Sequence, residues 1–277
     1  MGKSVGFIGN FKGKLGNAVG YKVSQSNSGT NQGVRVYQPN IKNPKSAAQA
    51  EQRAKYAPIF ATYNALKSII DRGQESKPYG NASRIAWLKK AFRAEYMPWF
   101  VKGSSMYAPV CCELTKGTLA GVTYENDRGE LKIICNGVNP YTSVATIGDV
   151  TSALMANYSF LKAGDQITIV IVEQINQTIR PTVFSFILDS ASTETQTMID
   201  AGDGNLFVDF SGAPVYFAVI VSREGTNGEH LRSTSTLLAT DEILDAAPYD
   251  TTSKKAAIAS YMATDGANAD WAEESIQ

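Results

Sequence analysis

Seven short apolar segments between residues 119 and 238 constrain most strongly how this chain can fold. They are rich in β-branched and aromatic residues, and turn signals separate them, of which Thr226-Asn227-Gly228 is typical of a tight hairpin. Three of the segments are apolar on both faces, which indicates central strands. Short strands with hairpin connections predict an antiparallel β-sandwich of immunoglobulin-like type. The segments are 119–125, 131–135, 166–173, 182–188, 206–210, 215–221 and 230–238.

A basic helical module is predicted before the strands, over residues 46–102. Ser46 is expected to cap a first helix, with Gln49 three residues later completing a capping box. Pro58 should break or kink this helix, because proline lacks the N–H that a helix interior needs. Apolar residues at helical spacing predict a second helix over roughly 83–100, with cations mostly on its opposite face. We also expect an inserted helix within 143–160 and short helices in the acidic C-terminal tail.

These patterns predict an α+β protein with four parts. A glycine-rich basic arm covers residues 1–45, a helical module covers 46–102, an antiparallel β-sandwich covers 103–240 and an acidic tail covers 241–277. Within the arm, two short strands around a polar tip predict a hairpin with a flexible loop. A chain of 277 residues can bury one large core or two smaller ones.

The formal net charge of zero conceals a strong segregation of charge along the chain. Residues 1–102 hold 17 Lys and Arg against four acids, a balance of +13, and the remaining residues hold nine against 22, a balance of −13. Two regions of opposite sign favour head-to-tail association, in which the basic surface of one copy docks on the acidic surface of the next. Alternatively, the basic region and its aromatic residues bind nucleic acid without sequence preference.

The sequence offers little for catalysis or cofactor binding. A phosphate-binding P-loop would need a glycine where Ile8 stands and a serine or threonine where Leu15 stands, and the glycine spacing does not match a dinucleotide-binding motif. His230 is the single histidine, and the three cysteines, which lack zinc-site spacing, are interpreted as buried reduced thiols. We therefore expect no enzyme activity, no metal and no cofactor. Without a spanning segment or a secretory signal, the protein is expected in the cytoplasm or in a particle assembled there.

One stretch of about 50 residues resembles a known family. It contains a Gly-Lys-x-Gly-Asn start, an Arg-x-x-x-Pro strand and an Asn-Pro-x-Ser-x-x-Gln-x-x-Gln-Arg-x-Lys helix. These motifs are Gly13, Lys14, Gly16, Asn17; Arg35 and Pro39; Asn43, Pro44, Ser46, Gln49, Gln52, Arg53 and Lys55. The stretch is similar to a family of uncharacterised proteins from gut Bacteroidota and their tailed phages. That resemblance implies a virion component of the portal, collar or tail, and it carries over no catalytic residue.

Together with this resemblance, the sequence predicts a non-enzymatic structural protein. The resemblance implies multiple copies in a ring, a collar or a tail- or portal-associated position of a tailed-phage particle, assembled in the host bacterial cytoplasm. Its expected partners are further copies of itself and other virion proteins, with non-specific DNA contact left open and no membrane or small-molecule substrate. Sequence-independent nucleic-acid binding is the alternative. The predicted assembly contacts are Gly13, Lys14, Gly16, Asn17, Gly20, Arg35, Lys42, Asn43, Gln49, Gln52, Arg53 and Lys55.

Overall fold

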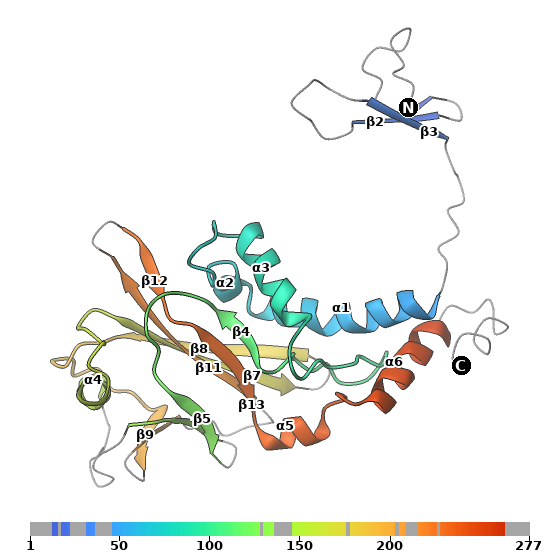
Figure 1. Cartoon of the computed structure of the whole chain (residues 1–277). Coiled ribbons are helices and arrows are strands. Elements are labelled where there is room, and N and C mark those ends of the chain that lie inside the picture. The colour runs from blue at the N-terminus through green and yellow to red at the C-terminus, as the bar shows by residue number, and fades with distance from the viewer. Residues whose placement is uncertain are drawn as a thin grey trace. The chain divides into compact units, whose positions relative to one another are not determined.

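The chain divides into two compact units, Met1–Lys45 and Ser46–Gln277. The computed structural model (Figure 1) describes residues 13–15, 18–22, 32–36, 46–127, 130–135, 146–175, 178–202, 205–208, 215–225 and 228–263. In the first unit, β1 (Gly13–Leu15), β2 (Ala18–Lys22) and β3 (Gln32–Val36) form an antiparallel sheet in that order. Gly13 lies opposite Gly20 across β1 and β2.

A six-stranded sheet is the centre of the second unit. Its order is β4 (Cys112–Thr115), β13 (Ser235–Ala239), β11 (Val215–Glu224), β7 (Gln166–Ile175) and β8 (Thr178–Ile187), and β12 (His230–Arg232) also pairs with β11. Each pairing is antiparallel. In β7, Ile169 belongs to one buried cluster and Val170 to another. A strand that is apolar on both faces is therefore covered on both faces.

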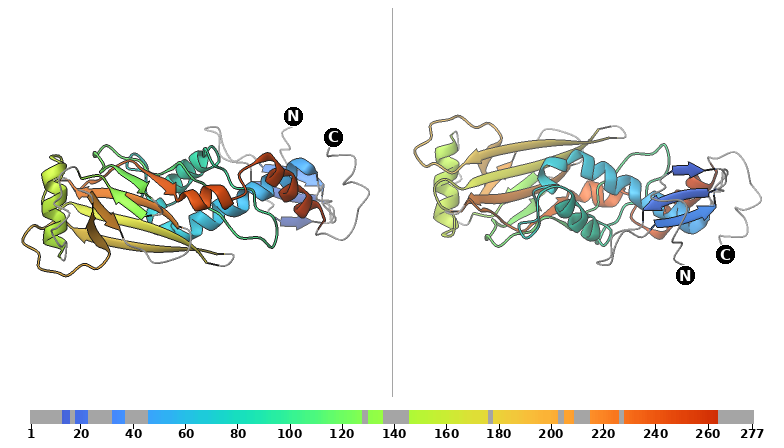
Figure 2. Two further views of the ribbon diagram at one scale, coloured as in Figure 1. Left: turned by 90° about the horizontal axis from the view of Figure 1, so that it is seen from below. Right: turned by 90° about the horizontal axis from the view of Figure 1, so that it is seen from above.

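A four-stranded sheet covers one face of the six-stranded sheet. Its order is β5 (Tyr124–Asp127), β6 (Glu130–Ile133), β10 (Asn205–Val208) and β9 (Ile199–Gly202). Leu131 and Leu206 of this sheet share one buried cluster with Ile169 and Phe217 of the larger sheet. Figure 2 shows α4 (Ile147–Asn157), in yellow-green, across the ends of these strands. Its first turn is closed by a capping box between Thr146 and Asp149.

Helices cover the other face of the six-stranded sheet (Figure 1). They are α1 (Ala47–Ala65), α2 (Lys67–Ile70), α3 (Asn81–Ala91) and α5 (Asp241–Ala246). Ile59 and Trp87 of this layer share a second buried cluster with Tyr216 and Leu237 of the sheet. Helix α6 (Thr251–Ala263) packs on α1, where Ala257 meets Ala54. The body is thus three layers, and the predicted α+β class with antiparallel sheets is confirmed.

The break expected as one outcome at Pro58 does not occur, and the second predicted helix is shorter than expected, both for identifiable reasons. Pro58 does not break α1, which runs through it. The missing N–H of Pro58 would orphan the carbonyl of Ala54, but the backbone N–H of Phe100 donates to that carbonyl at 3.3 Å. The helix predicted over 83–100 ends at Ala91. Beyond it the chain pairs with other segments, and the carbonyl of Tyr96 accepts the N–H of Val110 at 3.1 Å.

Other elements differ from prediction at their ends. Ser46 caps α1 as expected, its hydroxyl accepting the N–H of Gln49 at 3.3 Å. The predicted strand 230–238 is two strands, β12 and β13, separated at Ser233 and Thr234. The strand predicted at 119–125 begins only at Tyr124. Strands β4 and β9 were not predicted; their sequences, Cys-Glu-Leu-Thr and Ile-Asp-Ala-Gly, lack the apolar, β-branched composition of the predicted segments.

Candidate interaction site

The first unit contains part of the predicted contact set. Lys14 on β1 and Arg35 on β3 each lie opposite Val19 of the central strand, and Gly13 and Gly20 face each other. Gly16, Asn17, Lys42 and Asn43 lie outside the described residues. Residues 1–45 hold seven Lys and Arg and no Asp or Glu, which leaves 19 Lys and Arg against 26 acids in residues 46–277. The two units therefore carry formal charges of +7 and −7.

The other predicted contact residues lie on the first turns of α1. Gln52 is exposed, while Gln49, Arg53 and Lys55 are half-buried. The Lys55 ammonium pairs with Glu51 at 2.9 Å and lies 5.0 Å from the ring centre of Trp99. Their partner role stays a prediction, because Lys55 already has a partner within the chain.

Glu51 joins α6 to α1. Its carboxylate also pairs with Lys254 at 3.1 Å, and the Lys254 ammonium lies 5.2 Å from the ring centre of Trp99. Hydrogen bonding to Lys55 is the main cause that lowers the pKa of Glu51, and Lys254 adds to it against the opposing effect of burial. Two ammonium groups therefore cover one indole ring and share one carboxylate, which holds α6 in place.

The structure gathers four residues that the sequence analysis did not single out as a group. We call Arg72, Tyr79, His230 and Arg232 the Tyr79 patch. The Arg72 guanidinium lies 5.8 Å from the centre of the Tyr79 ring, and the His230 ring lies 6.3 Å from it on the β12 side. Tyr79 is 52% exposed, and His230 and Arg72 are exposed as well. No local signal could reveal the patch, because residues 72–79 meet residues 230–232 only in the folded sheet.

Glu75 connects the segments that form the patch through hydrogen bonds. Its carboxylate accepts hydrogen bonds from the backbone N–H of Arg232 at 2.9 Å, the N–H of Thr118 at 3.0 Å and the hydroxyl of Thr118 at 2.7 Å. Burial opposes ionisation of Glu75, but these hydrogen bonds outweigh it and lower its pKa. Three segments of the chain thus meet at one carboxylate. They are the loop between α2 and α3, the loop that precedes β5, and strand β12.

We predict that Glu75→Gln destabilises the protein by about 1–2 kcal/mol at pH 7, because an amide cannot replace a carboxylate toward three donors. Folding lowers the pKa of Glu75 below its ordinary 4.5, so its contribution is complete above that pH and is lost as the pH falls through the folded value. Urea unfolding at pH 7 and at pH 3 measures this, and the gap between wild type and Glu75→Gln should narrow at pH 3. An equal difference in stability between wild type and Glu75→Gln at both pH values would show that the negative charge of Glu75 does not contribute. The control is Ser76→Ala, a change at an exposed residue of the same loop, which should leave the stability almost unchanged at both pH values.

The guanidinium groups of the patch keep unused donors. Within the described part of the chain, neither Arg72 nor Arg232 forms an ion pair. Nε of Arg232 is buried without a hydrogen-bond acceptor there. Burial lowers the pKa of the Arg232 guanidinium, and the nearby charge of Arg72 lowers it further. Such a group gains from an external anion.

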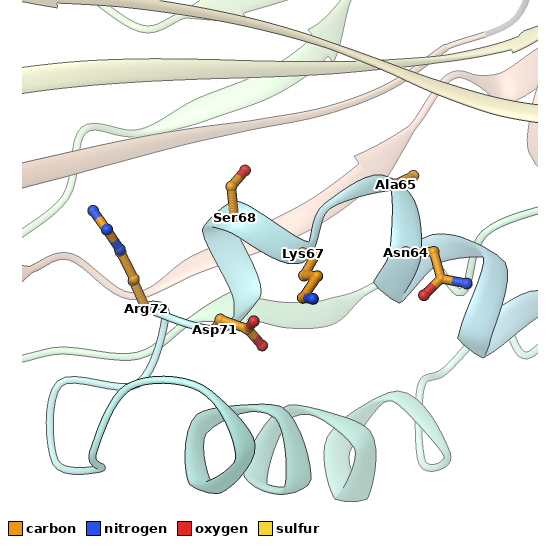
Figure 3. Close-up of a pocket in the computed structure, with 6 residues that line it drawn as sticks. All are labelled: Asn64, Ala65, Lys67, Ser68, Asp71 and Arg72. Atoms are coloured by element: carbon orange, nitrogen blue, oxygen red, sulfur yellow. The ribbon is translucent and has the colours of Figure 1, made fainter.

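An open pocket of about 620 Å³ adjoins the patch on the outer side of α2. Its lining includes Lys67, Asp71 and Arg72, and Figure 3 shows the Arg72 side chain projecting away from the other two. Asp71 accepts the hydroxyl of Tyr63 at 2.9 Å. Because the polar groups diverge, the pocket does not have the convergent arrangement typical of an active site.

The three cysteines form no disulfide, and Cys112 and Cys135 are buried as predicted, whereas Cys111 is half-buried. Burial raises the pKa of the Cys112 thiol to about 12 and that of Cys135 to about 11, and it raises the pKa of Cys111 as well. The nucleophilic thiolate is therefore scarce at neutral pH.

We predict that iodoacetamide at pH 8 leaves Cys112 and Cys135 unmodified in the folded protein while it alkylates all three cysteines in urea. Folding raises these pKa values, so the folded protein holds less thiolate than the unfolded chain at any pH below them. Mass spectrometry of peptides from both samples measures the difference. Rapid alkylation of Cys112 in the folded state would show that its burial is wrong.

No group of three or more potential ligand residues is placed to hold a metal ion in the ranges that the structure describes. None of the described helices is both long and apolar enough to cross a membrane. No protein-family model, curated protein or solved structure matches this chain. The geometry above is therefore the basis for a functional proposal.

Proposed function

We propose that this protein is a non-enzymatic assembly component of a tailed-phage particle, present in multiple copies in a ring, collar or tail. The observation that carries the proposal is the division into a basic unit, residues 1–45 at +7, and a body at −7. Opposite charges on two compact parts favour binding of one copy's basic unit to the next copy's body. The resemblance of residues 13–55 to phage-associated proteins supports the assignment to a phage particle.

The edge of the six-stranded sheet supports an assembly role as well. Strand β8 lies last in the strand order, and Val183 and Ile187 on it are 47% and 61% exposed. A long edge strand with exposed apolar residues is suited to strand addition from another chain. Pro181 lies in the same strand and limits such pairing to its later residues, because proline cannot donate to a new strand.

The more detailed fold prediction, an immunoglobulin-like β-sandwich, is part of this proposal. The core shared by the two sheets supports a sandwich body, and an immunoglobulin-like relation stays a prediction. A rigid body of this kind, with a separate basic unit, is a suitable building block for a ring. Localisation in the virion is part of the same proposal.

Native mass spectrometry at micromolar concentration tests the assembly function. The full chain is expected to form multimers, and a variant that lacks residues 1–45 is expected to remain monomeric. The control replaces the seven cations of residues 1–45 with glutamine, which separates charge from the length of the arm. A full chain that stays monomeric, alone and beside proteins encoded near it, would reject the proposal.

Sequence-independent nucleic-acid binding is the second candidate. The seven cations of residues 1–45, with no acid among them, favour it. It predicts binding to any duplex with a steep loss of affinity as salt rises. Fluorescence anisotropy with two unrelated duplexes, each measured at low and at moderate salt, tests this. Binding that is absent, or that is insensitive to salt, rejects the second candidate.

A further inference from the structure

The Tyr79 patch contains two guanidinium groups that form no ion pair among the described residues. Two of the carboxylates near it are engaged by uncharged donors: Asp71 accepts the hydroxyl of Tyr63, and Glu75 accepts Thr118 and the backbone N–H of Arg232. The exposed Arg72 guanidinium is therefore available to another anion, and Nε of Arg232, which is buried, has no acceptor among the described residues. The exposed ring of Tyr79 lies between these cations and His230.

We propose that the Tyr79 patch binds the acidic C-terminal segment, residues 264–277, of a second copy of this chain. This inference rests on the proposed assembly function and names one contact within it. The segment holds four acids and no Lys or Arg, and it includes one tryptophan. Carboxylates pair with guanidinium groups through two parallel hydrogen bonds, and an indole can stack on an arginine or tyrosine. The residues concerned are Asp265, Asp270, Trp271, Glu273 and Glu274.

The charged residues around the patch favour a short acidic peptide over nucleic acid. The Glu75 carboxylate accepts the backbone N–H of Arg232 at 2.9 Å, so a phosphate backbone that passed through the patch would meet its negative charge. Binding along a nucleic-acid strand needs a continuous row of cations. A peptide can instead place one or two carboxylates on the guanidinium groups and leave the neighbouring acids in solvent.

The position of the patch favours a second copy over the chain's own segment. Helix α6, which precedes the segment, packs near the start of α1, whereas Arg72 follows α2 beyond the other end of α1. Helix α1 has 19 residues, which corresponds to a length of about 28 Å. The chain's own segment would have to extend along the body at a cost in conformational entropy.

A labelled peptide of residues 264–277 tests the contact by fluorescence anisotropy. The receptor is the full chain with Asp270→Asn, Glu273→Gln and Glu274→Gln, so that its own segment does not compete. Arg72→Glu in this receptor is expected to weaken binding about tenfold, because attraction becomes repulsion. Arg72→Lys, which keeps the charge and loses the planar fork, should give an intermediate loss. Lys89→Glu, an equal charge reversal at an exposed lysine of α3, is the matched control and should leave binding unchanged.

Charge exchange between two full chains tests the second copy. One chain carries Arg72→Glu, and the other carries Asp270→Lys, Glu273→Lys and Glu274→Lys. Each alone is expected to associate less than wild type in native mass spectra, and an equimolar mixture is expected to form mixed complexes again. Circular dichroism of each variant confirms that loss of association is not loss of folding.

Four results would overturn the inference. Equal weakening by Arg72→Glu and Lys89→Glu would mean non-specific attraction, and peptide binding without any effect on native mass would mean that the segment docks on its own chain. A duplex that loses affinity in Arg72→Glu, while the peptide does not bind, would assign the patch to nucleic acid. If deletion of residues 1–45 abolishes multimers but neutralising the C-terminal acids does not, this inference fails and the assembly function stands.

Discussion

Replacing Asp165 with asparagine is expected to lower the free energy of unfolding by about 3 kcal/mol. Asp165 is 1% exposed and binds Arg223 through two hydrogen bonds, from Nε at 2.6 Å and from Nη2 at 2.7 Å. It also accepts the N–H of Lys162 at 2.8 Å. The ion pair is the main cause that raises the pKa of Arg223. Asparagine removes the countercharge and places an amide donor against the guanidinium, so an unpaired cation remains at the end of β11.

Urea unfolding at pH 7 measures this effect. The control is Glu125→Gln, which breaks an exposed ion pair with Lys132 and should leave the unfolding midpoint almost unchanged. Arg223→Met together with Asp165→Leu should recover part of the lost stability, because it removes both charges. If Asp165→Asn and Glu125→Gln lower the free energy of unfolding equally, the Asp165–Arg223 ion pair does not stabilise the protein more than an exposed pair does.

Alanine at Gly117 is expected to cost about 2–3 kcal/mol and to detach the loop before β5 from β12. A Cβ at this position would lie inside contact distance of the carbonyl oxygen of Arg232 and 2.5 Å from Oε2 of Glu75. The carbonyl belongs to the backbone of a paired strand and cannot move aside cheaply. The same change should disturb Arg232 and therefore the Tyr79 patch.

Gly103→Ala separates this clash from the ordinary cost of replacing a glycine. Gly103 has φ of +84° but no atom within 4 Å of an added Cβ, so its replacement should cost only about 1–2 kcal/mol. Hydrogen exchange should show faster opening at residues 117–119 and 230–232 in Gly117→Ala and not in Gly103→Ala. Equal exchange in both variants would contradict the close approach of loop and strand.

The central strands could be predicted because their burial leaves a local trace. Residues 166–173 and 215–221 are apolar at successive positions, and a strand covered by helices on one face and by a sheet on the other has that composition. The continuation of α1 through Pro58 could not be predicted, because the donor that satisfies Ala54, the N–H of Phe100, is distant in sequence. A prediction from local sequence includes the hydrogen bond that proline removes and cannot include a replacement donor from a distant segment.

The candidate site could not be predicted to the same degree. Glycine and lysine motifs drew attention to the first 55 residues, where Lys55 proves to pair with Glu51 in its own helix. The Tyr79 patch depends on β12 folding back on β11, which brings residues 230–232 to the α2–α3 loop. Sequence proximity alone suggests that Asp71 and Glu75 pair with these arginines. The structure shows that the two carboxylates bind uncharged donors instead.

The packing of α6 on the start of α1 has a consequence for binding strength. The chain enters the body at Ser46, directly before α1, and α6 lies against the first turns of that helix. The two points at which the basic unit and the acidic segment join the body, Ser46 and the end of α6, therefore lie at one end of α1. Once the basic unit or the acidic segment binds a neighbouring copy, the other is held at a high effective concentration, in roughly the millimolar range for short linkers. Two weak contacts can then act as one strong one through avidity.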